Sequence, residues 1–341
     1  MAAHEDDAAR ISAIYDDFGR RWAHGTSPLY EDWSVGIGSD PELPGRLAAL
    51  PRRLQQPILI YAAARWSGAP LVPFAQWRPW LEENWDRVLE VASHRATQTN
   101  EPNRCATFLP QLSRIDGPVA LLEVGTAAGL CLFPDRYGYT YDAPGGVRRI
   151  EPEDGVSPVR LECRLDDDAS FPPRMPRIAW RRGIDLSPID ARDPEAIDWL
   201  ATLIWPGPDH DARVARLRAA AAVAASEAPE IIQGDLLETV TDAAAAAPAD
   251  ATLVVFHSAV LLYLDAAGRA RFADIMAGLG RAIGRTVVWL SNETAATYPA
   301  VDAQLPPGLD SAQRFIQTRD GVPIALAGQH GAVYETAPFR A

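Results

Sequence analysis

The chain has 341 residues, of which 48% are hydrophobic and 23% charged, values typical of a folded protein with a substantial core. Its formal net charge is −13 and it has no basic run, which argues against nonspecific nucleic-acid binding. The chain contains no lysine. This absence excludes Schiff-base chemistry, pyridoxal-phosphate anchoring and a Walker-type phosphate loop, all of which need a lysine amine.

Signals for a location outside the cytoplasm are missing. No apolar run approaches the roughly 18 residues that span a bilayer, and the acidic start "MAAHEDDAAR" contains no signal peptide. The widely spaced Cys105, Cys131 and Cys163 form no CxxC pair and indicate no disulfide framework. We therefore expect a cytoplasmic protein.

Residues 1–115 are predicted to be mostly helical. Ala8–Ala23, Pro57–Arg65 and Trp77–Ser93 carry apolar residues at three- and four-residue spacing. Six of the ten tryptophans fall in this part, and packing between short helices explains them more simply than a pocket does. We expect this part to be a helical domain that covers a cleft and contacts a substrate.

From Pro118 onward, short apolar runs alternate with helical segments, which is typical of βαβ units and a parallel sheet. This predicts an α/β domain over residues 116–341. The expected strands are Val119–Val124, Ile178–Asp185, Glu230–Gln233, Thr252–Phe256 and Thr286–Leu290, and the expected helices are Pro194–Ile204, Ala212–Glu227 and Ala266–Ile283.

Two features depart from a plain βαβ pattern. Residues 131–176 are too long for a simple crossover, so we expect an insertion at one edge, with short strands at Tyr137–Asp142 and Val159–Leu165. Near the C-terminus, two apolar runs joined through Asp320-Gly321 predict an antiparallel hairpin at an edge of the sheet.

The segment "ALLEVGTAAGL" (120–130) is an apolar run followed by small residues. Glu123 ends the expected strand, and Gly125, Ala127 and Gly129 lead into an expected helix. Such a turn allows close approach of a ligand, and a helix N-terminus offers N–H donors. Leu130 stands where a dinucleotide fingerprint needs a small residue, so NAD binding is the weaker interpretation.

This E-x-G-x-x-x-G pattern resembles motif I of class I methyltransferases that use S-adenosylmethionine (SAM). Three later segments resemble the following strands of those enzymes: "RRGIDLSPID" (181–190), "APEIIQGDLLE" (228–238) and "TLVVFHSAVLLYL" (252–264). The resemblance implies a Rossmann-like fold, with Asp185 on the ribose hydroxyls of SAM and Asp235 near its adenine. For both aspartates the alternative is simple capping of a helix or turn.

A closer resemblance covers nearly the whole chain. The segments "GTSPLYEDW" (25–33), "TQTNEPNRC" (97–105), "EVGTAAGL" (123–130) and "GIDLSPID" (183–190) resemble a bacterial family called domain of unknown function 2332, or DUF2332. The family is recognised by a methyltransferase-like domain and implies no particular substrate.

Further candidates lie outside the cofactor motif. His257 ends an expected strand at the edge where open α/β sheets bind ligands, so it is the candidate general base; the alternative is a packed, hydrogen-bonded histidine. Asn100, Glu101 and Arg104 suit a small zwitterionic or carboxylate substrate. Their alternative is a capping box with a local ion pair. The histidine spacing indicates no metal site.

These features predict a SAM-dependent transferase, with methyl transfer to a small polar or carboxylate-bearing molecule as the first hypothesis. Other SAM chemistry remains open, such as aminocarboxypropyl transfer or cyclisation. An NAD-dependent oxidoreductase and a non-catalytic methyltransferase-like binding module are the remaining alternatives. We expect a small-molecule substrate and neither a nucleic-acid nor a membrane partner.

Overall fold

The computed structural model of this chain describes residues 2–339 and divides into two compact units. The helical unit comprises the residues up to Thr99 together with Pro194–Ala215, and the sheet unit comprises Asn100–Asp193 and the residues from Arg216 onward. The first boundary therefore lies before residue 100 and not near residue 115 as predicted. The reason is the helix Cys105–Leu112, whose side chains are almost all buried within the sheet unit.

The helical unit is held together by aromatic packing. The rings of Trp33 and Trp77 stack at 4.2 Å, and Tyr61 contacts both edge-on. These three side chains are fully buried, so the tryptophans Trp33 and Trp77 have the packing role expected of them. The helices of the unit are α1 (Ala2–Asp17), η1 (Phe18–Ala23), α2 (Pro28–Ser39), α3 (Leu43–Ala48), η2 (Arg52–Gln55), α4 (Pro57–Trp66), α5 (Phe74–Glu83), α6 (Trp85–His94), α8 (Pro194–Thr202) and the start of α9 (His210–Ser226).

The single helix predicted over Trp77–Ser93 is in fact two. α5 ends at Glu83 and α6 begins at Trp85, because Asn84 leaves the helical conformation at φ −112° and ψ 12°. Among the residues 2–339, no helix is both long and apolar enough to cross a membrane.

The sheet unit contains one continuous sheet of eleven strands in the order β3-β2-β4-β11-β10-β9-β8-β7-β1-β5-β6. Its strands are β1 (Pro118–Val124), β2 (Gly138–Ala143), β3 (Gly146–Ile150), β4 (Arg160–Leu165), β5 (Arg177–Asp185), β6 (Glu230–Gln233), β7 (Thr252–Ser258), β8 (Val287–Glu293), β9 (Arg314–Arg319), β10 (Val322–Gly328) and β11 (Val333–Glu335). The five strands β8, β7, β1, β5 and β6 are all parallel. Strand order reverses at β1, so this part is a doubly wound α/β sheet whose switch point lies at the carboxyl end of β1.

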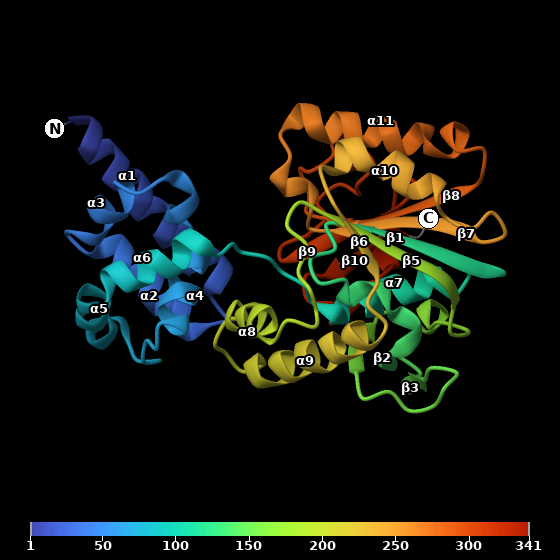
Figure 1. Cartoon of the computed structure of the whole chain (residues 1–341), viewed down its shortest axis with the longest axis horizontal. Coiled ribbons are helices and arrows are strands. Elements are labelled where there is room, and N and C mark those ends of the chain that lie inside the picture. Colours follow the sequence, from blue (N-terminus) through green and yellow to red (C-terminus); the bar gives the residue numbers. More distant parts are fainter. Residues whose placement is uncertain (1, 340–341) are drawn as a thin grey trace. The chain divides into compact units, whose positions relative to one another are not determined.

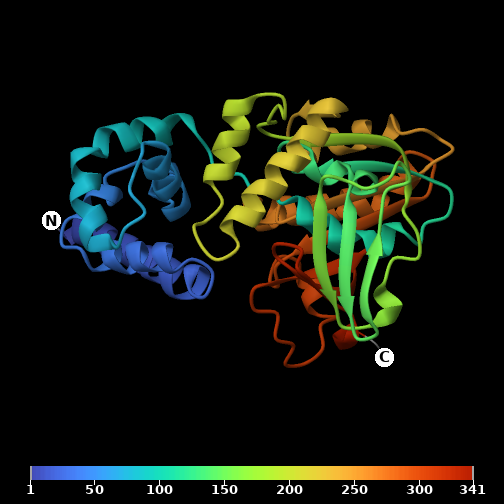
Figure 2. The same ribbon diagram turned by 90° about the horizontal axis from the view of Figure 1, so that it is seen from below.

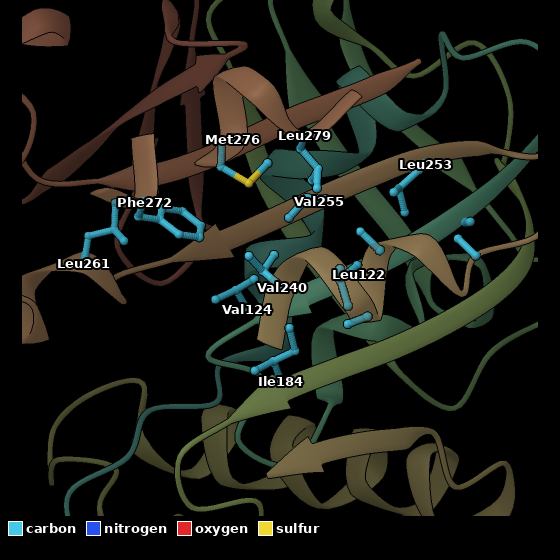
Figure 3. Close-up of a cluster of buried hydrophobic side chains, with 14 of the residues drawn as sticks. Leu122, Val124, Ile184, Val240, Leu253, Val255, Leu261, Phe272, Met276 and Leu279 are labelled. Atoms are coloured by element: carbon cyan, nitrogen blue, oxygen red, sulfur yellow. The ribbon is translucent and has the colours of Figure 1, made fainter. Parts of the chain in front are cut away.

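Helices cover both faces of this parallel region. α10 (Leu236–Ala245) and α11 (Ala266–Ala282) pack on one face, and α7 (Cys105–Leu112) lies on the other (Figure 1). The core beneath α10 and α11 brings together Leu122 of β1, Val255 of β7 and Phe272 of α11, all fully buried (Figure 3). Because both faces are covered, the central strands are continuous apolar runs, which is why they are recognisable in the sequence.

The expected insertion and hairpin are present, but their order across the sheet differs from the expectation. β9 and β10 form the antiparallel hairpin through Asp320 and Gly321, which have φ of 53° and 78°. This hairpin is interior, because β11 and the inserted strands β2, β3 and β4 continue the sheet beyond it. The inserted strands lie side by side in Figure 2, and β4 joins the rest of the sheet by parallel pairing with β11.

Candidate functional site

The small-residue turn after β1 has the backbone that its glycines predict, but no long helix follows it. Gly125, Ala127 and Gly129 have φ of 72°, 50° and 72°. Only a three-residue 3₁₀ turn, Leu130–Leu132, comes next, and Pro134 begins a second one. The helix predicted after Gly129 is therefore wrong, and with it the N-terminal row of donors expected for a cofactor.

The amides of this turn bind the protein's own acceptors. The Asp185 Oδ2 atom accepts from the Ala127 amide at 2.8 Å. The Asn100 Oδ1 atom accepts from the amides of Ala128 at 3.1 Å and Leu130 at 3.2 Å. Asp185 and Asn100, which were predicted to contact a ligand, thus stabilise the turn after β1.

The glycines of the turn are required by internal packing. A Cβ atom on Gly125 would lie 2.3 Å from a methyl carbon of Val260, in the loop after β7. A Cβ atom on Gly129 would lie 3.0 Å from Pro229. Their presence is explained without a cofactor, so they do not by themselves indicate one.

Glu123 lies beneath the turn in a strongly desolvated position. Its Oε2 atom accepts from the Thr126 hydroxyl at 2.6 Å, and its side chain is almost fully buried. Burial raises the pKa of this carboxyl to about 8, an effect that the Thr126 hydrogen bond opposes. Near neutral pH Glu123 is therefore largely protonated and can donate a hydrogen bond.

The aspartates expected on the cofactor stand at the carboxyl ends of neighbouring strands. Asp185 ends β5, and its two oxygens accept from the amides of Ala127 and Ser187. Asp235 follows β6 and caps α10 through the Leu237 amide, and its side chain is exposed. Asp235 thus has the capping role left open as its alternative, at the edge where ligands of such sheets bind.

Asn100, Glu101 and Arg104 belong to the sheet unit and are buried within it, with 6%, 4% and 7% of their surfaces exposed. Glu101 forms an ion pair with Arg216 at 3.0 Å and accepts from the Asn103 amide. Its expected role on a substrate amine is therefore not supported by its position. We call residues 100–105 the strap.

The strap joins four parts of the sheet unit. Asn100 holds the turn after β1, while the Asn103 side chain donates to the carbonyls of Glu162 in β4 and His330 beyond β10. Arg104 donates from Nε to the Gln329 carbonyl and from Nη1 to the Ser258 carbonyl, both at 3.0 Å. His330 takes part in this network through its backbone carbonyl.

Arg104 is a buried cation without a close anionic partner. No carboxylate lies within ion-pair distance of it, and no acceptor contacts its Nη2 atom, among residues 2–339. Desolvation lowers its pKa, and the more distant charges of Glu101 and Glu293 act in the opposite direction. The Oγ atom of the adjacent Ser258 is also buried without a partner. An arginine in this state suits an incoming carboxylate.

His257 is fully buried and both ring nitrogens are engaged. Its Nδ1 atom contacts Glu293 Oε1 at 2.7 Å, and its Nε2 atom accepts from the Trp289 indole at 3.0 Å. Because the indole can only donate, Nδ1 carries the proton. No nitrogen is left to accept a proton from a substrate, so the catalytic role predicted for His257 is corrected to the packed, hydrogen-bonded alternative.

Three polar residues of the site were not found from the sequence. Glu293 ends β8, Tyr298 precedes α12 (Pro299–Asp302), and Ser258 ends β7. Each has a buried side-chain oxygen with no hydrogen-bond partner in the described structure. The available signal was their place just beyond apolar strands, where ligands of α/β sheets bind.

The charged groups gather at one edge of the sheet unit. The phenol of Tyr263, in the loop after β7, lies near Arg104, Asp185 and Glu293, although its side chain is largely exposed. Partial desolvation raises the pKa of this phenol, Arg104 lowers it, and Asp185 and Glu293 raise it. In the described part of the chain no cluster of three or more His, Cys, Asp or Glu side chains is arranged to hold a metal ion.

Comparison with known proteins gives one match. The family model for uncharacterized proteins conserved in bacteria, DUF2332, matches residues 60–335. No curated protein and no solved structure matches the chain. The matched range contains the strap, the turn after β1 and the ends of β5, β7 and β8. The chain belongs to the DUF2332 family.

Proposed function

We propose that this protein is a SAM-dependent transferase acting on a small polar or carboxylate-bearing molecule, most simply a methyltransferase. The observation that supports the proposal best is the position of Glu123, Asp185 and Arg104. All three lie at the carboxyl edge of a doubly wound sheet, next to its switch point. Open α/β sheets bind their ligands at this point.

The residues suit the nucleoside half of SAM. Two amide donors fix the Asp185 carboxylate at the end of β5, and this preorganises it for a pair of ribose hydroxyls. Asp235 follows the next strand and would stand near the adenine. The methionyl half suits the turn after β1 less well, because Asn100 and Asp185 already use its amides. A carboxylate would find its donor at Arg104.

The chemistry asks little of the protein beyond positioning. Bound SAM would supply an electrophilic carbon on its sulfonium. Arg104 would hold a carboxylate, Asp185 would orient the ribose, and the apolar loop with Val260 would exclude water. With both nitrogens of His257 engaged, we assign no proton transfer to it.

Calorimetry tests the proposal. We expect the full chain to bind SAM and S-adenosylhomocysteine and to bind NADH more weakly or not at all. Asp185→Ala should weaken SAM binding at least tenfold, since it removes charge-assisted hydrogen bonds of about 1.5–3 kcal/mol. Asp190→Ala, at an exposed ion pair with Arg192, is the matched control. Wild-type protein that binds neither SAM nor S-adenosylhomocysteine would rule the proposal out.

One observation favours a second candidate function. Every amide from Gly125 to Leu130 already donates to an acceptor within the protein. A methyltransferase-like domain that serves as a binding module would tolerate such a turn. That function predicts that a carboxylate ligand binds at Arg104 and that no SAM-dependent turnover occurs. Mass spectrometry of candidate acceptors incubated with the protein and SAM would detect any turnover.

A further inference from the structure

Glu293 is held rigidly at one of its two oxygens. Its Oε1 atom accepts from the Nδ1 atom of His257 at 2.7 Å and from the amides of Val260 and Leu261 at 3.0 and 3.2 Å. The Trp289 indole fixes the histidine from its other side. Three donors on one oxygen leave this carboxylate a single orientation at the end of β8.

The other oxygen of Glu293 has no donor. Oε2 is buried, and no group among residues 2–339 donates a hydrogen bond to it. The side chain as a whole is only 4% exposed. Leaving a buried acceptor unsatisfied destabilises a protein, and more so for a charged group. A carboxylate fixed so firmly on one side and unsatisfied on the other is arranged to accept from something outside the chain.

Tyr298 supplies a second unsatisfied atom near the first. Its hydroxyl is also buried without a partner. Its ring stands edge-on to Trp289 at 5.8 Å, beside the His257–Glu293 pair. Burial raises the pKa of the phenol, and the charge of Glu293 raises it further. The hydroxyl therefore stays neutral and can accept or donate a hydrogen bond.

Among residues 2–339, no arginine lies at ion-pair distance from this carboxylate. Arg104 and Arg269 are the nearby guanidinium groups, yet neither forms an ion pair with Glu293 in the described structure. Arg269 instead donates to the carbonyls of Leu261 and Leu264. With one carboxylate and one phenol, the position lacks the ligand set of a metal site.

We propose that Glu293 and Tyr298 form a subsite for the ammonium group of a small organic cation. An ammonium carries up to three donors and a positive charge, which matches a charged acceptor and a phenol oxygen. This inference deepens the proposed function, on which its assignment to the acceptor substrate rests. The ammonium subsite then replaces Glu101, whose carboxylate is paired with Arg216, as the partner of a substrate amine.

Titration with propylammonium chloride tests the subsite, with 1-propanol as the neutral isostere and constant ionic strength. We expect the full chain to bind propylammonium in preference to 1-propanol by ligand-observed NMR. Glu293→Gln keeps an acceptor for His257 and the two amides but removes the charge, so it should weaken ammonium binding about tenfold or more. Tyr298→Phe should weaken ammonium binding several-fold, and this variant tests the subsite if Glu293→Gln fails to fold. Exposed Glu238→Gln is the control.

Binding of S-adenosylhomocysteine shows whether the ammonium belongs to the acceptor substrate or to the cofactor. If Glu293→Gln loses propylammonium binding but binds S-adenosylhomocysteine like wild type, the subsite belongs to the acceptor as proposed. If both are lost together, the ammonium is the cofactor's own and the assignment is wrong. If the wild type does not distinguish propylammonium from 1-propanol, the subsite is refuted. Failure to bind SAM would instead refute the proposed function and leave the ammonium measurement unaffected.

Discussion

The ends of β1 and β8 both carry a buried glutamate, but their surroundings are opposite. At the end of β1, the turn after Glu123 has every amide bonded within the protein, and its glycines are packed against neighbouring side chains. At the end of β8, Glu293 and nearby Tyr298 each keep a buried oxygen with no partner in the described structure. The recognisable sequence motif thus lies at the end of β1, where the polar groups of the turn are satisfied within the protein. The end of β8, where two buried oxygens lack partners, carries no such motif.

This difference separates two reasons why polar residues gather at the carboxyl edge of a sheet. Around β1 they satisfy the backbone of a strained turn, which the fold needs whatever is bound. Around β8, Glu293 and Tyr298 keep oxygens beyond those that satisfy the backbone, and these oxygens are the basis of the proposed ammonium subsite. Substitution of Asn100 should therefore act mainly on stability, and substitution of Glu293 mainly on binding.

The largest expected effect comes from the point where the strap is most tightly packed. A Cβ atom on Gly331 would lie 2.0 Å from the backbone oxygen of Asn103, and Gly331 has φ of 76°. We expect Gly331→Ala to lower the free energy of unfolding by about 3–5 kcal/mol, or to prevent folding. Gly321 has nearly the same φ, 78°, and open space around it. Gly321→Ala should therefore cost only about 1–2 kcal/mol in urea unfolding. Equal losses would show that the strap tolerates displacement.

Asn100 should come next. Asn100→Ala removes the acceptor of two buried amides, Ala128 and Leu130. An unsatisfied buried amide costs about 1–3 kcal/mol, so we expect a loss of about 2–4 kcal/mol in urea unfolding. Asn100→Asp keeps an acceptor and should recover part of the loss. The neighbouring exposed Thr99→Ala is the control, expected within about 0.5 kcal/mol of wild type. A stable Asn100→Ala variant with altered ligand affinity would return Asn100 to a binding role.

Glu123 gives a prediction that depends on pH. Its folded-state pKa of about 8 lies above its ordinary value of 4.5, so its contribution to stability is complete below about pH 4.5 and is lost as pH rises toward and past 8. Over this window the free energy of unfolding should fall by at most about 1.4 kcal/mol per pH unit. Glu123→Gln should remove the fall, so that the variant gains on wild type as pH rises. Parallel urea-unfolding curves between pH 5 and 8.5 would contradict a buried, protonated Glu123.

The central strands could be predicted because their cause is local. β1 and β7 are apolar runs covered on both faces, and each of the five parallel strands was located within three residues of its observed ends. The features that were missed have partners far away in the chain. Asn100 holds the turn after β1 from outside the βαβ unit, and this turn replaces the expected helix. A hydrogen-bond partner so far away in the chain does not change the pattern of apolar residues near Gly129, so the sequence there does not reveal it.

The same reason explains which site residues were found. Asp185 is the last residue of its strand, and its bond to the Ala127 amide joins two strand ends that the parallel topology brings together. The role of His257 depends on Glu293 and Trp289, which are more than 30 positions away on β8. Residue type and strand position suggested a base at 257, and only the pairing of β7 with β8 identifies the packed role.

The smallest expected effect tests that packed role directly. Trp289→Phe removes the donor to the buried Nε2 atom of His257 while keeping an aromatic ring of similar shape. The unsatisfied nitrogen should lower the free energy of unfolding by about 1–2 kcal/mol. Trp180→Phe is the matched control, since this half-buried indole makes no hydrogen bond within residues 2–339.

Propylammonium binding distinguishes the role of Trp289 from that of Glu293, the two partners of His257. Trp289→Phe leaves the bond between His257 and Glu293 in place, so propylammonium affinity should change less than in Glu293→Gln. If Trp289→Phe abolished ammonium binding at unchanged stability, the indole itself would line the subsite, and the boundary between the structural and binding roles would lie at Trp289 instead of at Glu293. If it changed neither quantity, the histidine would not need the indole, and the contrast between the ends of β1 and β8 would rest on Oε2 of Glu293 alone.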